Sequence, residues 1–354
     1  MANVSVRPSV ANESAWRGIA GVKNFSGKVT IEDAIKEAGL DYKVEAEPLL
    51  RVPQSVIDAI MRGEAVDFNP TSRNIITSHK STFREDNGAV LGVVGRDYGI
   101  VDNIKAFEFI NFIKEVSGEE PMIETAGAFG NGERRFVSCR LGGDCYLNGN
   151  EDAVKNYVVF TNSHDGSGAV MSFFTPVRVI CQNTLNMAIR GAANKIVFKH
   201  TKNVNHRLDW EIEENRRRAL EVFSKSVQFS QKFIDKMLTL KAENLTTEQI
   251  RDITHKMYLT PRQFELFTKN NYSVDGIDEI STRTKNQILA FKDALDFGIG
   301  QENYRGTKLW MLNGMTTMLQ NDRKWKSEED KFNSIMEGDA AKKTQKMYDL
   351  LIAA

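Results

Sequence analysis

The stretch from residue 156 to residue 190 constrains the fold more than any other part of the chain. Two runs rich in Val, Phe and Thr flank a turn at 164–168 that contains two glycines. This pattern is typical of a β-hairpin. After Pro176 the apolar residues recur about every 3.6 residues, which predicts a helix from about Ile180 to Ala193. The chain is therefore expected to contain an antiparallel hairpin that leads directly into a helix.

Short strands and short helices alternate through the rest of the first 208 residues. We expect strands at 42–52, 74–78, 89–95, 121–128 and 134–147, and helices at 31–38, 55–62 and 103–116. Pro48 favours a sheet edge for the first of these strands. Residues 195–199 fit either a short strand or an extension of the preceding helix.

Helical patterns alone follow, at 210–240, 246–258, 261–267, 281–296, 307–319 and 327–351. The prediction is an α+β protein: an antiparallel β-sheet with packed helices in the N-terminal ~208 residues, followed by an all-α C-terminal part. We accordingly divide the chain into an N-terminal arm (1–28), an α+β core domain (29–208) and a helical C-terminal region (209–354).

Acidic residues are missing from a long part of the chain. Asp and Glu make up 47 of the 354 residues, yet none occurs between Asp165 and Asp209. Lys and Arg release counterions from phosphates, and rings such as Phe173 and Phe174 stack on bases. We therefore predict that the cations of this span bind the phosphates of single-stranded nucleic acid, with two amides on bases or backbone. The residues are Arg178, Gln182, Asn183, Arg190, Lys195, Lys199, Lys202 and Arg207.

A structural explanation of the same span stays open. If its strand and helix are mostly buried, acids are excluded from them and the cations merely face solvent. Arg178 shows the two alternatives, because it lies in an otherwise apolar strand. An outward Arg178 would meet phosphate. An inward Arg178 needs a partner, since an unpaired buried charge is costly. The candidate partners are Asp165, His164 and Glu124.

The sequence contains no strong catalytic or metal-binding signature. Cys139, Cys145 and Cys181 with His164 have the residue types of a zinc site, but the spacing of the first two is not that of a short structural motif. Cys181 and His164 could form a nucleophilic pair, and His164 with Asp165 an acid–base pair. Buried thiols and an ordinary glycine turn explain the same residues. We predict no catalytic residue, metal or cofactor, and a non-enzymatic role is favoured.

Composition bears on partners and location. Lys plus Arg equals Asp plus Glu at 47 each, so the net charge is zero. A zero net charge does not exclude a nucleic-acid partner, because the local clustering of positive charge matters for such binding. No apolar run is long enough for a transmembrane helix, and the N-terminal residues lack the apolar core of a signal peptide. The three cysteines have no disulfide-type spacing. We expect a cytoplasmic protein with reduced thiols and no membrane partner.

The central stretch also resembles a known family. Residues 161–169, Thr-Asn-Ser-His-Asp-Gly-Ser-Gly-Ala, and residues 174–185, Phe-Thr-Pro-Val-Arg-Val-Ile-Cys-Gln-Asn-Thr-Leu, resemble the signature of the phage/plasmid-like family called domain of unknown function 932. Residues 53–85 depart from the family pattern and look like an insertion. Similar blocks occur at 15–18, 38–40, 91–98, 123–127 and 306–314. The resemblance implies a bacterial, phage or plasmid setting and transfers no catalytic residue.

Two hypotheses from different classes follow. The first is a nucleic-acid-binding protein of phage or plasmid type that binds or anneals single-stranded DNA in replication or recombination. By fold-level analogy with phage annealing proteins, it would be a homo-oligomer. The alternative is a non-enzymatic assembly factor of a mobile element. Its apolar docking face would lie on the helical part, at Trp310, Met311, Met315 and Met318, although a helical core explains these residues as well.

Overall fold

The predicted hairpin lies at the centre of the main sheet in the computed structural model, which describes residues 22–113, 121–147, 153–178, 183–184, 195–298, 300–336 and 338–354. Strands β7 (Ala153–Ser163) and β8 (Val170–Arg178) pair antiparallel, with Val154 opposite Arg178. The sheet has the order β1-β5-β6-β7-β8-β10, with β9 beside β8. Its other strands are β1 (Val22–Asn24), β5 (Met122–Phe129), β6 (Arg134–Tyr146), β9 (Asn183–Thr184) and β10 (Lys195–Phe198). An antiparallel sheet followed by a helical C-terminal part confirms the predicted α+β class.

Both faces of the main sheet are buried, which explains the nearly continuous apolar run of β7. Tyr157 and Val159 face one core, which they share with the C-terminal helices, and Val158 and Phe160 face the other. The second core contains helices α1 (Ile31–Glu37) and α3 (Asn103–Phe107) and the 3-10 helix η3 (Glu108–Phe112). Side chains alternate along a strand. Polar residues of β6 and β7 near the hairpin turn must therefore also point to one of these two sides.

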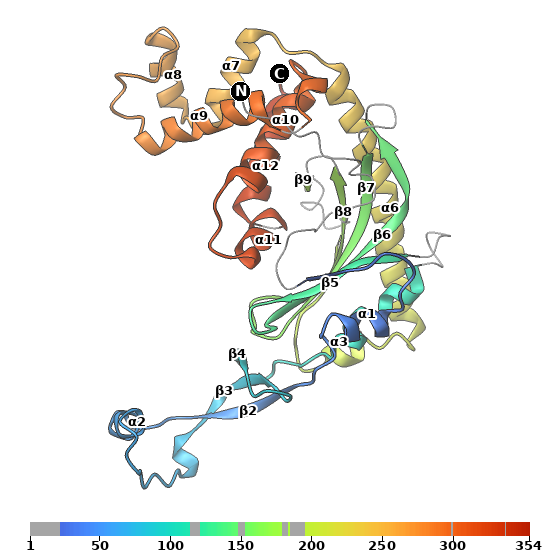
Figure 1. Ribbon diagram of the computed structural model, residues 1–354, viewed down its shortest axis with the longest axis vertical. Helices are drawn as coiled ribbons and strands as arrows, with labels where there is room; N and C mark the ends of the chain where they lie inside the picture. The colour runs from blue at the N-terminus through green and yellow to red at the C-terminus, as the bar shows by residue number, and fades with distance from the viewer. Residues whose placement is uncertain are drawn as a thin grey trace.

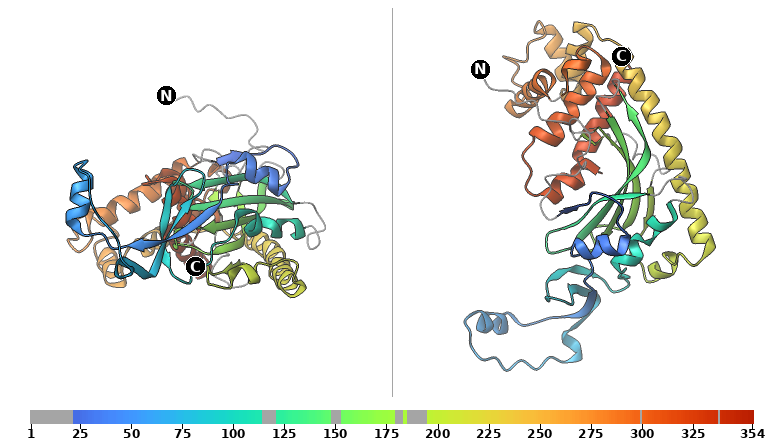
Figure 2. Two further views of the ribbon diagram at one scale, coloured as in Figure 1. Left: turned by 90° about the horizontal axis from the view of Figure 1, so that it is seen from below. Right: turned by 45° about the vertical axis from the view of Figure 1, so that its right-hand side comes forward.

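The helical part begins with a 30-residue helix, α6 (Glu213–Ala242), which runs along the main sheet in Figures 1 and 2. Thr246 and Thr260 begin the next two helices with capping boxes. Every residue of α10 (Lys308–Thr317) is buried, so this helix forms the centre of the helical core. The other helices are α7 (Thr247–Tyr258), α8 (Pro261–Lys269), α9 (Thr282–Phe297), α11 (Glu328–Met336) and α12 (Asp339–Ile352).

A second sheet of order β2-β3-β4 carries a segment that extends away from the body, with helix α2 (Gln54–Met61) at its far end (Figure 1). The strands are β2 (Val44–Leu50), β3 (Ile75–Arg84) and β4 (Val90–Gly95). Pro48 lies on the edge strand β2 at a register shift, as its residue type predicts. We call residues 44–80 the projection. Its exposed large apolar side chains are Leu50, Ile57, Ile60, Met61, Val66, Ile75 and Ile76.

Several predicted segments differ from the structure. Residues 183 and 184 form β9 beside Val177 and Arg178, so the prediction of a continuous helix at 180–193 is wrong at these positions. The rest of that range, 179–182 and 185–193, lies outside the described residues. The helix predicted at 327–351 is two helices, because Gly338 has a non-helical backbone and begins α12. Of the predicted arm, residues 1–21 lie outside the described residues and 22–24 form β1.

Candidate functional site

Residues 199–207, which we call the cationic loop, follow β10 and include helix α5 (Val204–Arg207). Three predicted site residues, Lys199, Lys202 and Arg207, lie on this loop and are exposed. Arg207 Nη2 donates to the carbonyl oxygen of Lys199 at 2.8 Å and to Thr201 Oγ1 at 2.7 Å. These hydrogen bonds join the two ends of the loop, which therefore presents its cations from a closed segment.

The cationic loop packs against residues 98–100. His200 is buried, with Nδ1 2.8 Å from the carbonyl oxygen of Gly99, and Asn205 donates to the carbonyl of Ile100 at 2.9 Å. A Cβ atom on Gly99 would lie 2.4 Å from the carbonyl oxygen of Thr201, so glycine alone permits this approach of the two backbones. The position of the exposed cations therefore depends on the fit between two loops.

A groove of about 550 Å³ opens beside the cationic loop. The ring of Tyr98 stacks on His200 in its wall, with centroids 4.6 Å apart. The Arg96 side chain is 72% exposed and only 3.8 Å from the carboxylate of Asp97, a surface ion pair that contributes little. The groove is lined by Thr77, Ser78, Gly95, Arg96, Asp97, Tyr98, His200 and Thr201. It combines one arginine, one carboxylate, hydroxyl groups and stacked rings.

The structure places the other predicted site residues apart from the cationic loop. Lys195 is half-buried in β10, opposite Phe173, and Arg178 is at the far end of β8, next to Asn183 in β9. A strand rises about 3.3 Å per residue. The eight steps from Val170, beside the cationic loop, to Arg178 therefore span roughly 26 Å. The side chains of Arg178 and Asn183 and all of Gln182 and Arg190 lie outside the described residues.

Two predicted partnerships are contradicted by these positions. Arg178 lies at the opposite end of the hairpin from the turn, so His164 and Asp165 are not its partners. Phe173 is 5% exposed in the core shared with the helical part, and it cannot stack on a base. In both cases the path and orientation of β8 are the cause, and the sequence order alone does not show them.

The hairpin turn at 164–168 is a structural junction. Thr82 Oγ1 on β3 donates to the carbonyl of His164 at 2.6 Å, and the His164 backbone N–H donates to the carbonyl of Glu133 at 2.8 Å. Asp165 accepts hydrogen bonds from Ser163 and Ser167, and these hold the pKa of its carboxyl below the ordinary value although burial opposes ionisation. The Asp165 carboxylate therefore stabilises the hairpin turn through its hydrogen bonds with Ser163 and Ser167. The proposed acid–base pair of His164 with Asp165 is not formed.

Polar side chains gather where the two sheets meet. We call Tyr42, Tyr98, Asn103, Arg135, Asn162, His164 and His200 the buried polar cluster. Arg135 on β6 is fully buried, and its Nε donates to the hydroxyl of Tyr42 at 2.7 Å. Asn162 stands opposite Arg135 on β7, so the two side chains leave the same face of the sheet. Burial lowers the pKa of Arg135 to about 10.

Further contacts join the rest of this cluster. Asn162 Nδ2 lies 3.1 Å from Asn103 Oδ1 and 3.2 Å from His164 Nε2. The rings of His164 and His200 have centroids 6.3 Å apart. Arg135 is not among the residues predicted from the sequence. It follows Arg134 and precedes the apolar Phe136, so no local signal distinguished it from an exposed arginine at a strand end.

The described residues give no support to a zinc site. Cys139 is fully buried in the core beneath helices α1 and α3, and burial raises the pKa of its thiol. Within the described ranges, no group of three or more His, Cys, Asp or Glu residues could hold a metal ion. Cys181 and the Cys145 side chain fall outside those ranges. No helix of the described segments is long and apolar enough to cross a membrane.

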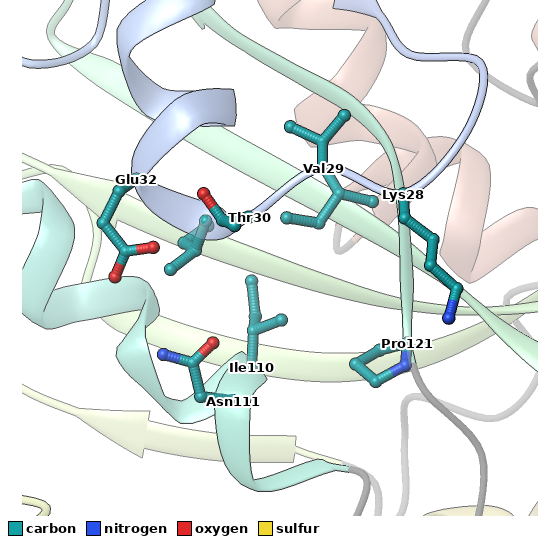
Figure 3. Close-up of a pocket in the computed structure, with 9 residues that line it drawn as sticks. Lys28, Val29, Thr30, Glu32, Ile110, Asn111 and Pro121 are labelled. Carbon is teal, nitrogen blue, oxygen red and sulfur yellow. The ribbon is translucent and has the colours of Figure 1, made fainter.

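One further pocket, of about 300 Å³, lies between the start of α1 and η3 (Figure 3). Lys28 and Glu32 bring opposite charges to it, and Ile110 and Pro121 bring apolar surface. Thr30 is occupied in capping α1 through the backbone N–H of Asp33. Its lining contains no buried polar side-chain atom without a partner among the described residues. The pocket therefore offers less to a ligand than the groove or the buried polar cluster.

The comparisons with known proteins agree with the resemblance seen in the sequence. The family model described as Domain of unknown function (DUF932) matches residues 90–340. The hairpin turn, the cationic loop and the blocks at 91–98, 123–127 and 306–314 fall inside this match. The blocks at 15–18 and 38–40 and the projection fall outside it. No match was found among curated proteins or among solved structures.

Proposed function

The chain belongs to the family Domain of unknown function (DUF932), and because that description assigns no activity, we propose from the surface itself that the protein binds single-stranded nucleic acid. The observation that carries the proposal is the cationic loop, on which Lys199, Lys202 and Arg207 are exposed together. Phosphates are attracted to such a cluster whatever the net charge of the chain.

The groove beside the loop supports a single strand better than a duplex. The half-buried ring of Tyr98 forms part of the wall, and unpaired bases stack on aromatic rings. Arg96 adds an exposed guanidinium to the groove, next to the carboxylate of Asp97. We propose that the backbone of the strand follows the cationic loop and that its bases lie toward the groove. Annealing of complementary strands in phage or plasmid replication or recombination is the corresponding biological role, in the cytoplasm.

Replacing Lys199 and Lys202 together by glutamine should flatten the salt dependence of binding. Each phosphate contact on a single strand contributes about 0.7 to the slope of log K against log salt, so the double variant should lose about 1.4. Fluorescence anisotropy of a labelled oligonucleotide at several salt concentrations measures the slope. Lys324→Gln with Lys326→Gln is the matched control, since these residues are also exposed and lie on the connection before α11. An equal loss in both variants, or an unchanged slope, would remove the loop from the proposal.

A specific observation also favours the second function, assembly without nucleic acid. The docking face predicted at Trp310, Met311 and Met315 is wrong, because these side chains are 7%, 0% and 0% exposed in the helical core. The projection instead carries seven exposed large apolar side chains, and no residue of α2 is buried. Exposed apolar side chains gathered on one segment are typical of interaction sites. We propose a second copy of this chain as its partner, which makes the protein a homo-oligomer.

Ile60→Glu should weaken this self-association about tenfold or more. Burying an isoleucine contributes about 1.5–3 kcal/mol, and each 1.4 kcal/mol is a factor of ten. Size-exclusion chromatography with light scattering over a concentration series gives the dissociation constant. Leu289→Glu on α9 is the control, because Ile60 and Leu289 are 55% and 56% exposed. A wild-type protein that stays monomeric at high concentration would contradict the assembly proposal.

A further inference from the structure

Arg135 is a buried cation without a counter-charge in the described part of the chain. Its side chain is fully buried, and neither Nη1 nor Nη2 has a hydrogen-bond partner among the described residues. Its contacts are the Tyr42 hydroxyl, which accepts from Nε, and the Tyr42 ring beneath the guanidinium at 4.4 Å. Arg84, a second cation, also lies over that ring at 3.5 Å. The environment therefore adds positive charge where a buried arginine needs negative charge.

Other polar side-chain atoms of the buried polar cluster also lack partners. Asn162 Oδ1, His164 Nδ1 and His200 Nε2 are all buried and make no hydrogen bond within the described residues. For His200 the protonation state follows from its surroundings. Nδ1 faces the carbonyl oxygen of Gly99, which can only accept, so Nδ1 carries the hydrogen. Burial lowers the pKa of His200, and Nε2 is therefore a bare acceptor.

The unused groups form a complementary set. The guanidinium of Arg135 can donate to two oxygens of one anion in its usual forked geometry. The nearby amide oxygen and imidazole nitrogen can each accept a hydrogen from the same ligand. The oxygens of a fully ionised anion would repel these acceptors. An anion that still carries a hydroxyl could accept from Arg135 and donate its hydrogen to one of the acceptors.

We propose that the buried polar cluster is a binding site for a small oxyanion that retains a proton, of the phosphate or phosphate-monoester class. Arg135 Nη1 and Nη2 donate to its ionised oxygens, and either Asn162 Oδ1 or His200 Nε2 accepts the hydrogen of its hydroxyl. His164 Nδ1 provides a third contact. This site shares His200 with the cationic loop but uses none of its exposed cations, and it goes beyond the nucleic-acid proposal.

Two open hollows are lined by members of the cluster, although Arg135 and Asn162 line neither of them. Tyr42, Asn103 and His164 line a pocket of about 390 Å³, and Tyr98 and His200 line the groove beside the cationic loop. Tyr42 both lines the first pocket and contacts Arg135, so this ring separates the pocket from the guanidinium. The ligand therefore reaches Arg135 when the Tyr42 side chain moves.

The test compares two probes of similar size on the full-length protein by isothermal titration calorimetry at neutral pH. Inorganic phosphate carries a proton under these conditions, whereas sulfate does not. We expect phosphate to bind at least tenfold more tightly than sulfate. Equal binding of the two, or no binding of phosphate at millimolar concentration, overturns the proposal. A nucleoside 5′-monophosphate in a parallel titration shows whether the site takes a free phosphate or a monoester.

Two variants keep the proposal falsifiable. Arg135→Met removes an unpaired buried charge and keeps an apolar side chain of similar length, so it should fold, and it should lose phosphate binding at least tenfold. His200→Phe retains the stacked ring on Tyr98 but removes Nε2, and it should reduce the preference for phosphate over sulfate. If both variants bind phosphate as the wild type does, the anion merely collects on the surface and the proposal is wrong. Oligonucleotide binding should be unchanged in Arg135→Met, so the two proposals fail separately.

Discussion

Gly92→Ala is expected to destabilise the protein by about 1–3 kcal/mol, the usual cost of forcing an extra group into packed structure. A Cβ atom at position 92 would lie 2.6 Å from the Cα and 2.9 Å from the carbonyl oxygen of Asp165. Both are backbone atoms of the hairpin turn, and the turn is held by the hydrogen bond from Thr82 to the carbonyl of His164. The clash therefore cannot be relieved by rotating a side chain, and β4 must separate from the turn.

Gly95→Ala provides the control for this effect. Gly95 lies on the same strand, and a Cβ atom there would meet nothing within 4 Å. Substitutions at open surface positions usually change stability by less than about 0.5 kcal/mol. Urea unfolding followed by tryptophan fluorescence compares the two variants. Similar free energies of unfolding for both would show that the second sheet does not rest on the turn as described.

Periodicity alone predicted most elements of the sheet and of the helical part. The runs at 121–128 and 134–147 became β5 and β6, and the helices predicted at 246–258 and 261–267 became α7 and α8. The errors have local causes. A two-residue strand such as β9 has no periodicity to detect. The apolar pattern at 327–351 is helical throughout, and it does not show that Gly338 has a non-helical backbone and begins a second helix.

The candidate site was less predictable than the fold. The acid-free span includes the cationic loop, but sequence order does not show that β8 separates Arg178 from Lys199. Arg135 was missed for another reason. Adjacent arginines at 134 and 135 suggest an exposed strand end, whereas a strand covered on both faces has no solvent side. Burial of both faces depends on helices far along the chain, and no local pattern contains that information.

Trp310→Ala is expected to cost about 3–5 kcal/mol, the range for truncating a buried large aromatic side chain. Trp310 is 7% exposed on α10, and its Nε1 donates to the carbonyl oxygen of Leu295 on α9 at 3.0 Å. The variant therefore creates a cavity and also removes a hydrogen bond to a buried carbonyl, which adds to the loss. Thermal and urea unfolding of the full-length protein measure the change.

Phe297→Ala is the matched control. Phe297 is also aromatic, it is the last residue of α9, the helix that carries Leu295, and it is 84% exposed. Its replacement should change the free energy of unfolding by less than about 0.5 kcal/mol. If Trp310 were instead an exposed docking residue, Trp310→Ala would change the free energy of unfolding little, because an exposed side chain contributes little to the stability of the free chain. A cost below about 1 kcal/mol for Trp310→Ala would contradict the buried position of this side chain. A large cost assigns the residue to the core and leaves the projection as the apolar surface available to a second copy.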